Sequence, residues 1–183
     1  MSDTLVINLF GGPGAGKSTT SAGVFSLLKL HEINCELVTE FAKSLVWKQS
    51  LFELEDQMYV TGSQYHNMSI LNNKVDVIIT DSPLIVGLMY NTVSDTFIKL
   101  TLELFRGFNN LNYNINRVKK YEATGRLQTE EEAKDIDDRF KTFLINNDIG
   151  YKDIQGTYEG INKIVSDILK LKGKTTNLKI MCA

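Results

Sequence analysis

Residues 4–19 read TLVINLFGGPGAGKST, an apolar run that leads directly into a glycine-rich turn. The apolar part is typical of a buried strand, and the pattern that begins at Gly16 is typical of a helix. Within the turn, residues 11–18 match G-x-x-x-x-G-K-[ST] at every fixed position. Glycines allow successive backbone N–H groups to point at phosphate oxygens, and the start of the helix adds its positive end. The stretch therefore predicts a phosphate-binding loop between a strand and a helix.

The positions of this loop have different expected roles. Lys17 can reach the β- and γ-phosphates of a nucleoside triphosphate, and the hydroxyl of Ser18 can bind Mg²⁺. The remaining phosphate contacts are expected from the loop and the first helical turn, at Gly12, Gly14, Ala15, Gly16 and Thr19.

Strands and helices are expected to alternate along the rest of the chain. Further strands are predicted at residues 33–39, 75–80, 111–117 and 150–156, and further helices at 40–48, 53–72, 84–90, 94–108, 129–146 and 157–172. Such alternation predicts one α/β domain over residues 1–183, in which about five parallel strands are covered by helices on both faces. Apolar residues and asparagines alternate over 111–117, which predicts a strand with one wetter face, near the sheet edge or the cleft. The tail, residues 174–183, is expected to be an extra strand or disordered.

Composition excludes several classes of protein. The chain has 183 residues, 43% of them hydrophobic, and 20 basic against 22 acidic residues give a net charge of −2. This balance argues against a surface that is basic throughout and binds nucleic acid, and no apolar run is long enough to predict a membrane partner. A strand pattern follows soon after Met1, so no secretory leader is expected. Cys35 and Cys182 are far apart, which favours a reducing cytoplasm over a disulfide-stabilised secreted fold.

Two predicted strands are followed by acidic residues, Glu40 after residues 33–39 and Asp81 after residues 75–80. Ligands of open parallel sheets bind outside the carboxyl ends of the strands. Asp81 is expected to hold Mg²⁺ directly or through a water, and Glu40 to act as a general base on an acceptor hydroxyl. The structural alternative for each is an acid that caps the N-terminus of a helix.

A basic segment precedes the helix predicted at residues 129–146. Arg117 and Arg126 are expected to contact the phosphates from a lid over about residues 117–128, with Lys119 and Lys120 as auxiliaries. The alternative is a solvated charged loop, which the two lysines alone would favour.

These motifs occur in the order GGPGAGKST, Glu40, Asp81-Ser82 and a late arginine segment before an acidic helix. The set resembles P-loop nucleoside and nucleotide kinases over about residues 4–145. It looks closest to the deoxynucleoside-kinase and nicotinamide-riboside-kinase-like groups, including small kinases encoded by bacteriophages. The resemblance implies a P-loop NTPase domain that uses ATP and Mg²⁺, with Glu40 as the base and the arginine-bearing lid at residues 117–126.

The resemblance also implies residues that recognise the acceptor. A glutamine on a middle helix often reads the base in deoxynucleoside kinases, a role that falls on Gln64 or Gln57, while Phe41, Tyr65 or Trp47 could stack on the base. The third strand departs from the family pattern because it ends in Asp81-Ser82-Pro83 without the arginine of D/E-R-S. A nucleoside monophosphate, or a hydroxyl on a modified base in DNA, therefore stays open as the acceptor beside a free nucleoside.

The expected activity is transfer of the γ-phosphate of ATP, with Mg²⁺, to a nucleoside, a nucleotide or a related hydroxyl acceptor. Two alternatives remain. One is a kinase that acts on DNA, at a 5′ end or on a hydroxymethylated base, and the other is a regulatory P-loop ATPase without a small-molecule acceptor. The sequence leaves open whether ATP or GTP is the donor and whether the chain forms a homodimer.

Overall fold

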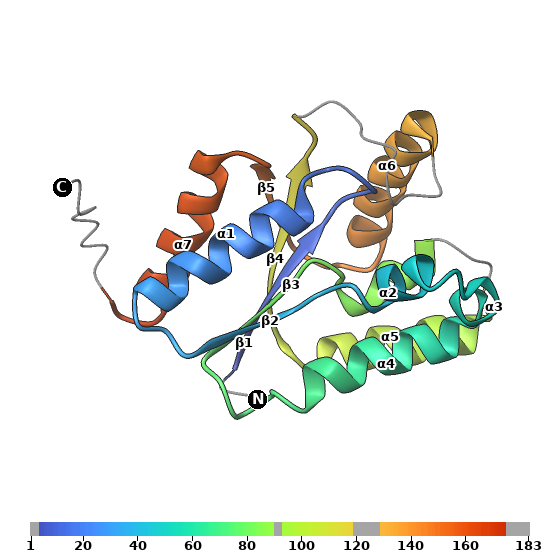
Figure 1. Cartoon of the computed structure of the whole chain (residues 1–183), viewed down its shortest axis with the longest axis horizontal. Helices are drawn as coiled ribbons and strands as arrows, with labels where there is room; N and C mark the ends of the chain where they lie inside the picture. The colour runs from blue at the N-terminus through green and yellow to red at the C-terminus, as the bar shows by residue number, and fades with distance from the viewer. Residues whose placement is uncertain (1–3, 90–92, 119–128, 175–183) are drawn as a thin grey trace.

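A five-stranded sheet forms the centre of the molecule (Figure 1). The computed structural model describes residues 4–89, 93–118 and 129–174. All strand pairs are parallel, and the strand order is β2-β3-β1-β4-β5. The strands are β1 (Leu5–Phe10), β2 (Cys35–Val38), β3 (Val77–Thr80), β4 (Asn109–Asn116) and β5 (Lys152–Gln155). The expected α/β class with parallel strands is confirmed.

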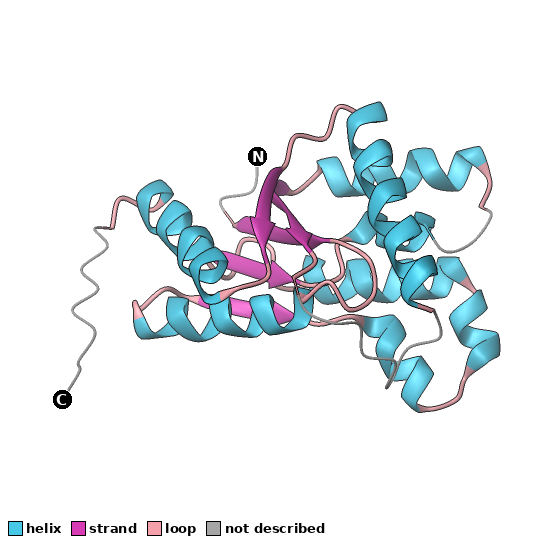
Figure 2. Ribbon diagram, turned by 90° about the horizontal axis from the view of Figure 1, so that it is seen from above, coloured by secondary structure: helices cyan, strands magenta, loops and turns pink. Residues whose placement is uncertain are grey.

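Helices cover both faces of this sheet (Figure 2). On one face lie α1 (Lys17–Leu30) and α7 (Tyr158–Leu171), which contact each other. The opposite face carries α4 (Gln57–Ser69), the 3-10 helix η1 (Leu84–Met89), α5 (Asp95–Arg106) and α6 (Glu130–Asn146). Two short helices, α2 (Phe41–Trp47) and α3 (Leu51–Glu55), lead from β2 to α4. In the part of the chain that the structure describes, none of the helices has the length and apolar character needed to cross a bilayer.

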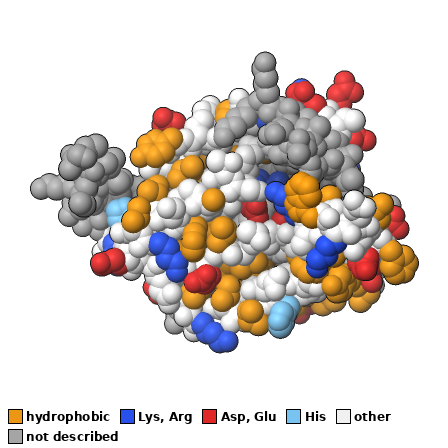
Figure 3. All heavy atoms as spheres, in the orientation of Figure 1, with side chains coloured by type: hydrophobic (Ala, Val, Ile, Leu, Met, Phe, Trp, Pro, Cys, Tyr) orange, Lys and Arg blue, Asp and Glu red, His pale blue; other side chains and the backbone are white. Residues whose placement is uncertain are grey.

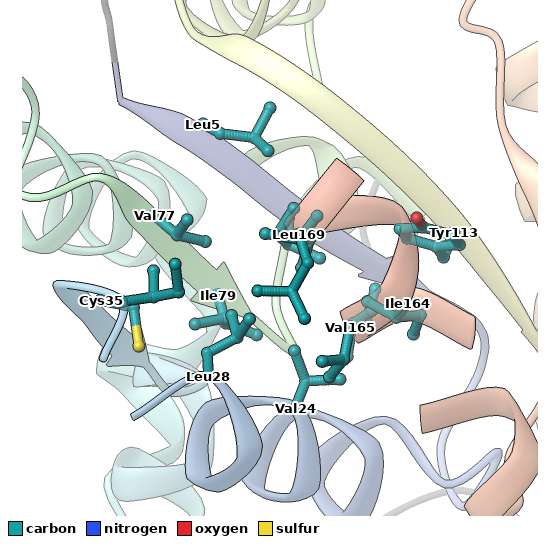
Figure 4. Packing of buried hydrophobic residues seen from close by; sticks show 14 of the residues in the cluster. Leu5, Val24, Leu28, Cys35, Val77, Ile79, Tyr113, Ile164, Val165 and Leu169 are labelled. Carbon is teal, nitrogen blue, oxygen red and sulfur yellow. The ribbon is translucent and has the colours of Figure 1, made fainter. Parts of the chain in front are cut away.

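Alternate residues of β1 supply the two hydrophobic layers. Leu5, Ile7 and Leu9 face α1 and α7 in the cluster shown in Figure 4, where α1 contributes Val24 and Leu28. The opposite face of the strand carries its remaining apolar residues toward α4, α5 and α6. Burial of an aliphatic side chain of this size contributes about 1.5–3 kcal/mol, so the sheet is fixed firmly from both sides.

The helix expected at residues 53–72 is instead two helices, α3 and α4, that meet at Asp56. The Asp56 carboxylate accepts a hydrogen bond from the Tyr59 N–H at 3.0 Å and so caps the start of α4. A capping residue has non-helical backbone angles, which interrupts the continuous helix. A capping box starts α6, because Thr129 and Glu132 exchange hydrogen bonds.

The asparagine face of β4 is buried, so the prediction of a wetter face was wrong. Asn112 and Asn114 are 8% and 2% exposed, and β4 lies between β1 and the edge strand β5. Asn8 of β1 donates to Asn110 and Asn112 at 2.8 and 3.0 Å, and Asn114 donates to Asp153 at 2.8 Å. The amide groups of these asparagines thus donate to other asparagines, to Asp153 and to backbone carbonyls, as buried polar groups commonly do, while the side-chain oxygen of Asn8 has no hydrogen-bond partner among the described residues.

Asp167 fixes α7 to the edge of the sheet. Its carboxylate accepts hydrogen bonds from the Tyr113 hydroxyl at 3.1 Å and from Lys152 at 2.9 Å, and it also contacts Lys163 on its own helix. Burial opposes ionisation of Asp167, but the hydrogen bonds from Lys163, Lys152 and Tyr113 outweigh it and lower the pKa of the carboxyl.

We expect Asp167→Asn to lower the free energy of unfolding by about 2 kcal/mol near neutral pH, because hydrogen bonds to a charged group are lost. A depressed pKa stabilises the fold above the ordinary value of 3.8 and loses this effect as pH falls through the folded-state value. The difference between wild type and variant should therefore shrink on acidification. Urea unfolding at several pH values tests this, with Glu103→Gln on the exposed side of α5 as the control. A difference that does not change with pH would contradict the assignment.

Candidate functional site

The glycine-rich loop leaves the carboxyl end of β1, the central strand, and leads into α1. Gly11, Gly14 and Gly16 have φ values of 136°, 77° and 107°. Residues that carry a Cβ atom rarely adopt such positive φ angles. No side-chain hydrogen bond caps α1 at Gly16, and the first N–H groups of a helix have no partner within the helix itself. Ser18 and Thr19 are exposed at this end of the helix, whereas Ala15 is buried. The loop thus has the backbone conformation and open helix end of an anion site.

Lys17 lies across the loop. Its Nζ donates hydrogen bonds to the carbonyl oxygens of Gly11 and Gly12 at 2.6 and 3.1 Å. Burial lowers the pKa of Lys17, and the carboxylates of Glu40 and Asp81 oppose this shift. The ammonium group is therefore held within the loop and supported by acidic groups.

Glu40 and Asp81 follow β2 and β3, which are adjacent strands, and the structure brings them together as the sequence predicts. The Asp81 carboxylate accepts a hydrogen bond from the Glu40 N–H at 3.1 Å, and Asp81 is only 4% exposed. Burial raises the pKa of Glu40, an effect that Lys17 opposes and Asp81 reinforces. Figure 3 shows acidic and basic side chains meeting in a recess of the molecular surface.

The helix-cap alternative for Glu40 is not realised. Glu40 occupies the position before α2, but its side chain makes no capping hydrogen bond. Its carboxylate instead interacts electrostatically with the Lys17 ammonium group and with the Asp81 carboxylate. A half-buried acid with a raised pKa beside a cation and a second acid is an arrangement typical of functional sites.

Arg117 lies directly after β4 and points toward the loop, but its donors are already engaged. The guanidinium donates to Asp137 of α6 through Nε and Nη2 at 3.2 and 2.9 Å, and to the Pro13 carbonyl through Nη1 at 2.8 Å. The second Asp137 oxygen accepts a hydrogen bond from the Gly12 N–H, so this amide faces a carboxylate. Sequence reasoning missed Asp137. The expected lid residues Arg126, Lys119 and Lys120 lie outside the described residues.

Gln64 joins three elements around the carboxylates. Its side-chain carbonyl accepts from the Phe41 N–H at 3.0 Å, and its amide donates to the Ser82 carbonyl at 3.0 Å and to the Thr80 hydroxyl at 3.3 Å. The side chain is 4% exposed. Gln64 can read a base only by exchanging these bonds, and in this structure it orders the polypeptide on both sides of the carboxylates.

The predicted stacking residues fall in different places. Tyr65 packs edge-on against Phe108 at 5.9 Å among core residues, while Trp47 is exposed at the end of α2. Gln57 donates to the Leu54 carbonyl. Phe41 is the predicted stacking residue that lines a pocket.

This pocket has a volume of about 460 Å³ and lies between α2 and α4, beginning at the residue after Glu40. Its walls include Phe41, Met58, Tyr59, Ser63, His66 and Asn67. The rings of Phe41 and Tyr59 meet edge-on, with centroids 5.4 Å apart. The α4 residues recur at helical spacing and share one face, a periodicity that the sequence alone could have revealed.

The described residues contain no group of three or more His, Cys, Asp and Glu side chains that could hold a metal ion on their own. A Mg²⁺ site does not require a group of this size, because proteins usually hold Mg²⁺ through one or two carboxylates together with substrate phosphates. Asp81 and Ser18 offer a carboxylate and a hydroxyl of this kind beside the loop. These oxygen donors fit the chemistry of Mg²⁺.

No model of a protein family matches the chain, and no curated protein is significantly similar to it. The site must therefore be interpreted from its own geometry and charge.

Proposed function

We propose that the protein is a phosphotransferase of the P-loop NTPase class that uses ATP and Mg²⁺ and phosphorylates a hydroxyl of a nucleoside, a nucleotide or a related acceptor. The observation that carries this proposal is the convergence of Lys17 in a glycine-rich loop with Glu40 and Asp81 at the ends of two adjacent strands. The cytoplasm, where ATP is abundant, suits such an enzyme.

Each group has a separate role in the proposed reaction. Lys17 and the N–H groups at the start of α1 bind the phosphates, and Asp81 with Ser18 would hold Mg²⁺, which neutralises phosphate charge. A bond forms between the acceptor oxygen and the γ-phosphorus as the bond to the bridging oxygen of ADP breaks. The hydroxyl proton goes to a carboxylate oxygen of Glu40. The raised pKa of Glu40 makes it a stronger base than an ordinary carboxylate.

The pocket beside Glu40 supports a particular kind of acceptor. Phe41 and Tyr59 supply aromatic surface, and Ser63, His66 and Asn67 supply hydrogen-bonding groups. No lysine or arginine is among the described residues that line it. A nucleoside monophosphate needs cations for its phosphate, so the pocket favours an uncharged planar heterocycle that carries a hydroxyl, such as a nucleoside.

A base within single-stranded DNA is the second candidate acceptor. Large hydrophobic side chains are exposed on α2, α3 and α4, with Trp47, Phe52 and Met58 at 63%, 85% and 71%, and Met58 lines the pocket. Exposed aromatic residues such as Trp47 and Phe52 can stack on neighbouring bases of a strand. Strongly salt-dependent binding to an oligonucleotide would support this candidate over a free nucleoside.

The proposal is tested by transfer of labelled γ-phosphate from ATP to a panel of acceptors. The panel contains nucleosides, nucleoside monophosphates, nicotinamide riboside, and DNA with natural or hydroxymethylated bases, with Lys17→Ala as the control. The expected result is a labelled monophosphate formed from a nucleoside, with no labelled diphosphate formed from a nucleoside monophosphate. Label found only in free phosphate would overturn the proposal in favour of a regulatory ATPase.

We expect Tyr59→Ala to raise the KM of the acceptor about tenfold and to leave the KM of ATP unchanged. Stacking of one base on an aromatic ring contributes about 1–3 kcal/mol, and 1.4 kcal/mol corresponds to a factor of ten. Tyr59 is half exposed, so its truncation should have little effect on folding. The matched control is Tyr158→Ala at the exposed start of α7, on the other face of the sheet. An unchanged acceptor KM in Tyr59→Ala would exclude the pocket as the acceptor site.

A further inference from the structure

Asp137 of α6 connects three parts of the candidate site. One carboxylate oxygen accepts the Gly12 N–H of the loop, and the other accepts two hydrogen bonds from Arg117 at the end of β4. Arg117 in turn donates to the carbonyl of Pro13, the next loop residue. At the loop entrance, the Gly12 N–H thus bonds to Asp137, and the Pro13 carbonyl bonds to Arg117, the ion-pair partner of Asp137.

This arrangement is closely packed and largely removed from water. The side chains of Arg117 and Asp137 are 11% and 20% exposed. A Cβ atom on Gly12 would lie 2.5 Å from the Ala133 carbonyl oxygen and 2.9 Å from Asp137, so only glycine allows α6 to approach the loop this closely. Charge-assisted hydrogen bonds in such surroundings are stronger and more directional than neutral ones. The contact therefore restricts where the loop backbone can lie.

The charges also suit a role beside a phosphate site. Asp137 alone would repel a polyphosphate, but Arg117 neutralises it at 2.9 Å. The two groups act on Lys17 in opposite directions, since Asp137 favours its charged form and Arg117 disfavours it. The pair can thus hold the loop while adding little net charge to it.

We propose that Asp137 is a positioning residue for nucleotide binding, which holds the phosphate loop in its binding conformation through Gly12 and Arg117. This inference rests on the proposed function, because it assumes that the loop binds a nucleoside triphosphate. Asp137 touches the loop backbone and Arg117, and it acts on the phosphates through them.

Calorimetric binding of Mg²⁺–ATP and of inorganic tripolyphosphate to the full chain tests the proposal. Asp137→Ala should weaken the binding of both ligands about tenfold, since it removes the hydrogen bonds that the Asp137 carboxylate accepts from Gly12 and Arg117. Asp137→Asn keeps an acceptor for Gly12 and should weaken both about threefold. Tripolyphosphate has no base or ribose, so an equal effect on both ligands places the defect at the phosphates. The control is Asp135→Asn, which removes a 68% exposed acid on the same helix.

The NMR resonance of the Gly12 amide proton distinguishes a loss of loop positioning from a general loss of stability. The Gly12 amide resonance should lie downfield in wild type, remain shifted in Asp137→Asn, and move upfield in Asp137→Ala. Arg117→Gln combined with Asp137→Asn should weaken binding by less than the product of the two single effects.

Two outcomes would overturn the inference in distinguishable ways. Wild-type affinity for both ligands in Asp137→Ala would exclude the positioning role and leave the proposed function intact. A wild-type chain that binds neither ligand, and is unaffected by Lys17→Ala, would remove the proposed function and the positioning role with it. If Asp137→Ala does not fold, wild-type affinity in Asp137→Asn, together with additive effects in the double variant, overturns the role instead.

Discussion

Glutamine in place of Glu40 is expected to lower the rate of phosphate transfer about a thousandfold, the middle of the range for loss of a general base. Gln has nearly the same size and cannot accept the hydroxyl proton. Binding of ATP should stay within about twofold of wild type, because phosphate contacts come from the loop and α1. Glu36→Gln is the matched control, since Glu36 lies on β2, the strand that leads to Glu40, and pairs with Lys29 at the surface.

The pH profile gives an independent test of the same residue. A general base must be deprotonated, so the rate is lost as pH falls through the pKa of Glu40. Burial raises this pKa above its ordinary value of 4.5, and the acid limb should therefore lie at higher pH than for an exposed glutamate. Initial rates at saturating ATP measure the limb, which should disappear in the residual activity of Glu40→Gln. Weak ATP binding with normal turnover in this variant would show that Glu40 serves binding instead.

Alanine in place of Lys17 is expected to raise the Kd of Mg²⁺–ATP about a hundredfold. Loss of one partner from a buried, hydrogen-bonded charge pair costs about 2–5 kcal/mol, and a factor of ten corresponds to about 1.4 kcal/mol. In the free protein the same ammonium group bonds the carbonyls of Gly11 and Gly12, so the loop also loses an internal support.

Calorimetric titration measures this change, with Lys29→Ala as the control. Lys29 belongs to the same helix, but its side chain pairs with Glu36 at the surface, 3.2 Å away. Thermal unfolding of each variant shows whether the fold is retained. Unchanged ATP affinity in Lys17→Ala would mean that the glycine loop is not a phosphate site.

Much of the fold could be predicted because its signals are local. The central strands β1 and β3 are buried on both faces and appear in the sequence as nearly continuous apolar runs. The polar face of β4 was misinterpreted because the partners of its asparagines, Asn8 and Asp153, are remote in sequence. The break at Asp56 had a local signal, an acid placed to cap α4, which the expectation of one continuous helix over residues 53–72 overlooked.

In the candidate site, too, some residues could be predicted from local sequence and others could not. The loop is contiguous in sequence, and Glu40 and Asp81 meet because parallel strands end at one edge of the sheet. The contact of Asp137 with Gly12 depends on how α6 packs, and no local pattern encodes it. The amide of Gln64 resembles a base-reading group until its bonds to Phe41 and Ser82 are known.

The position of β1 has a consequence for how the chain folds. Leu5 pairs with Val77 on one side and with Asn109 on the other, so one edge of the first strand stays open until β3 has been synthesised and the other until β4 has been synthesised. Parallel pairing over such sequence distances is slow, because chain entropy is lost before contacts form. An apolar strand with open edges can meanwhile pair with other chains. The loop that follows β1 is thus synthesised long before α6, and it reaches its final conformation only once α6 has packed against it.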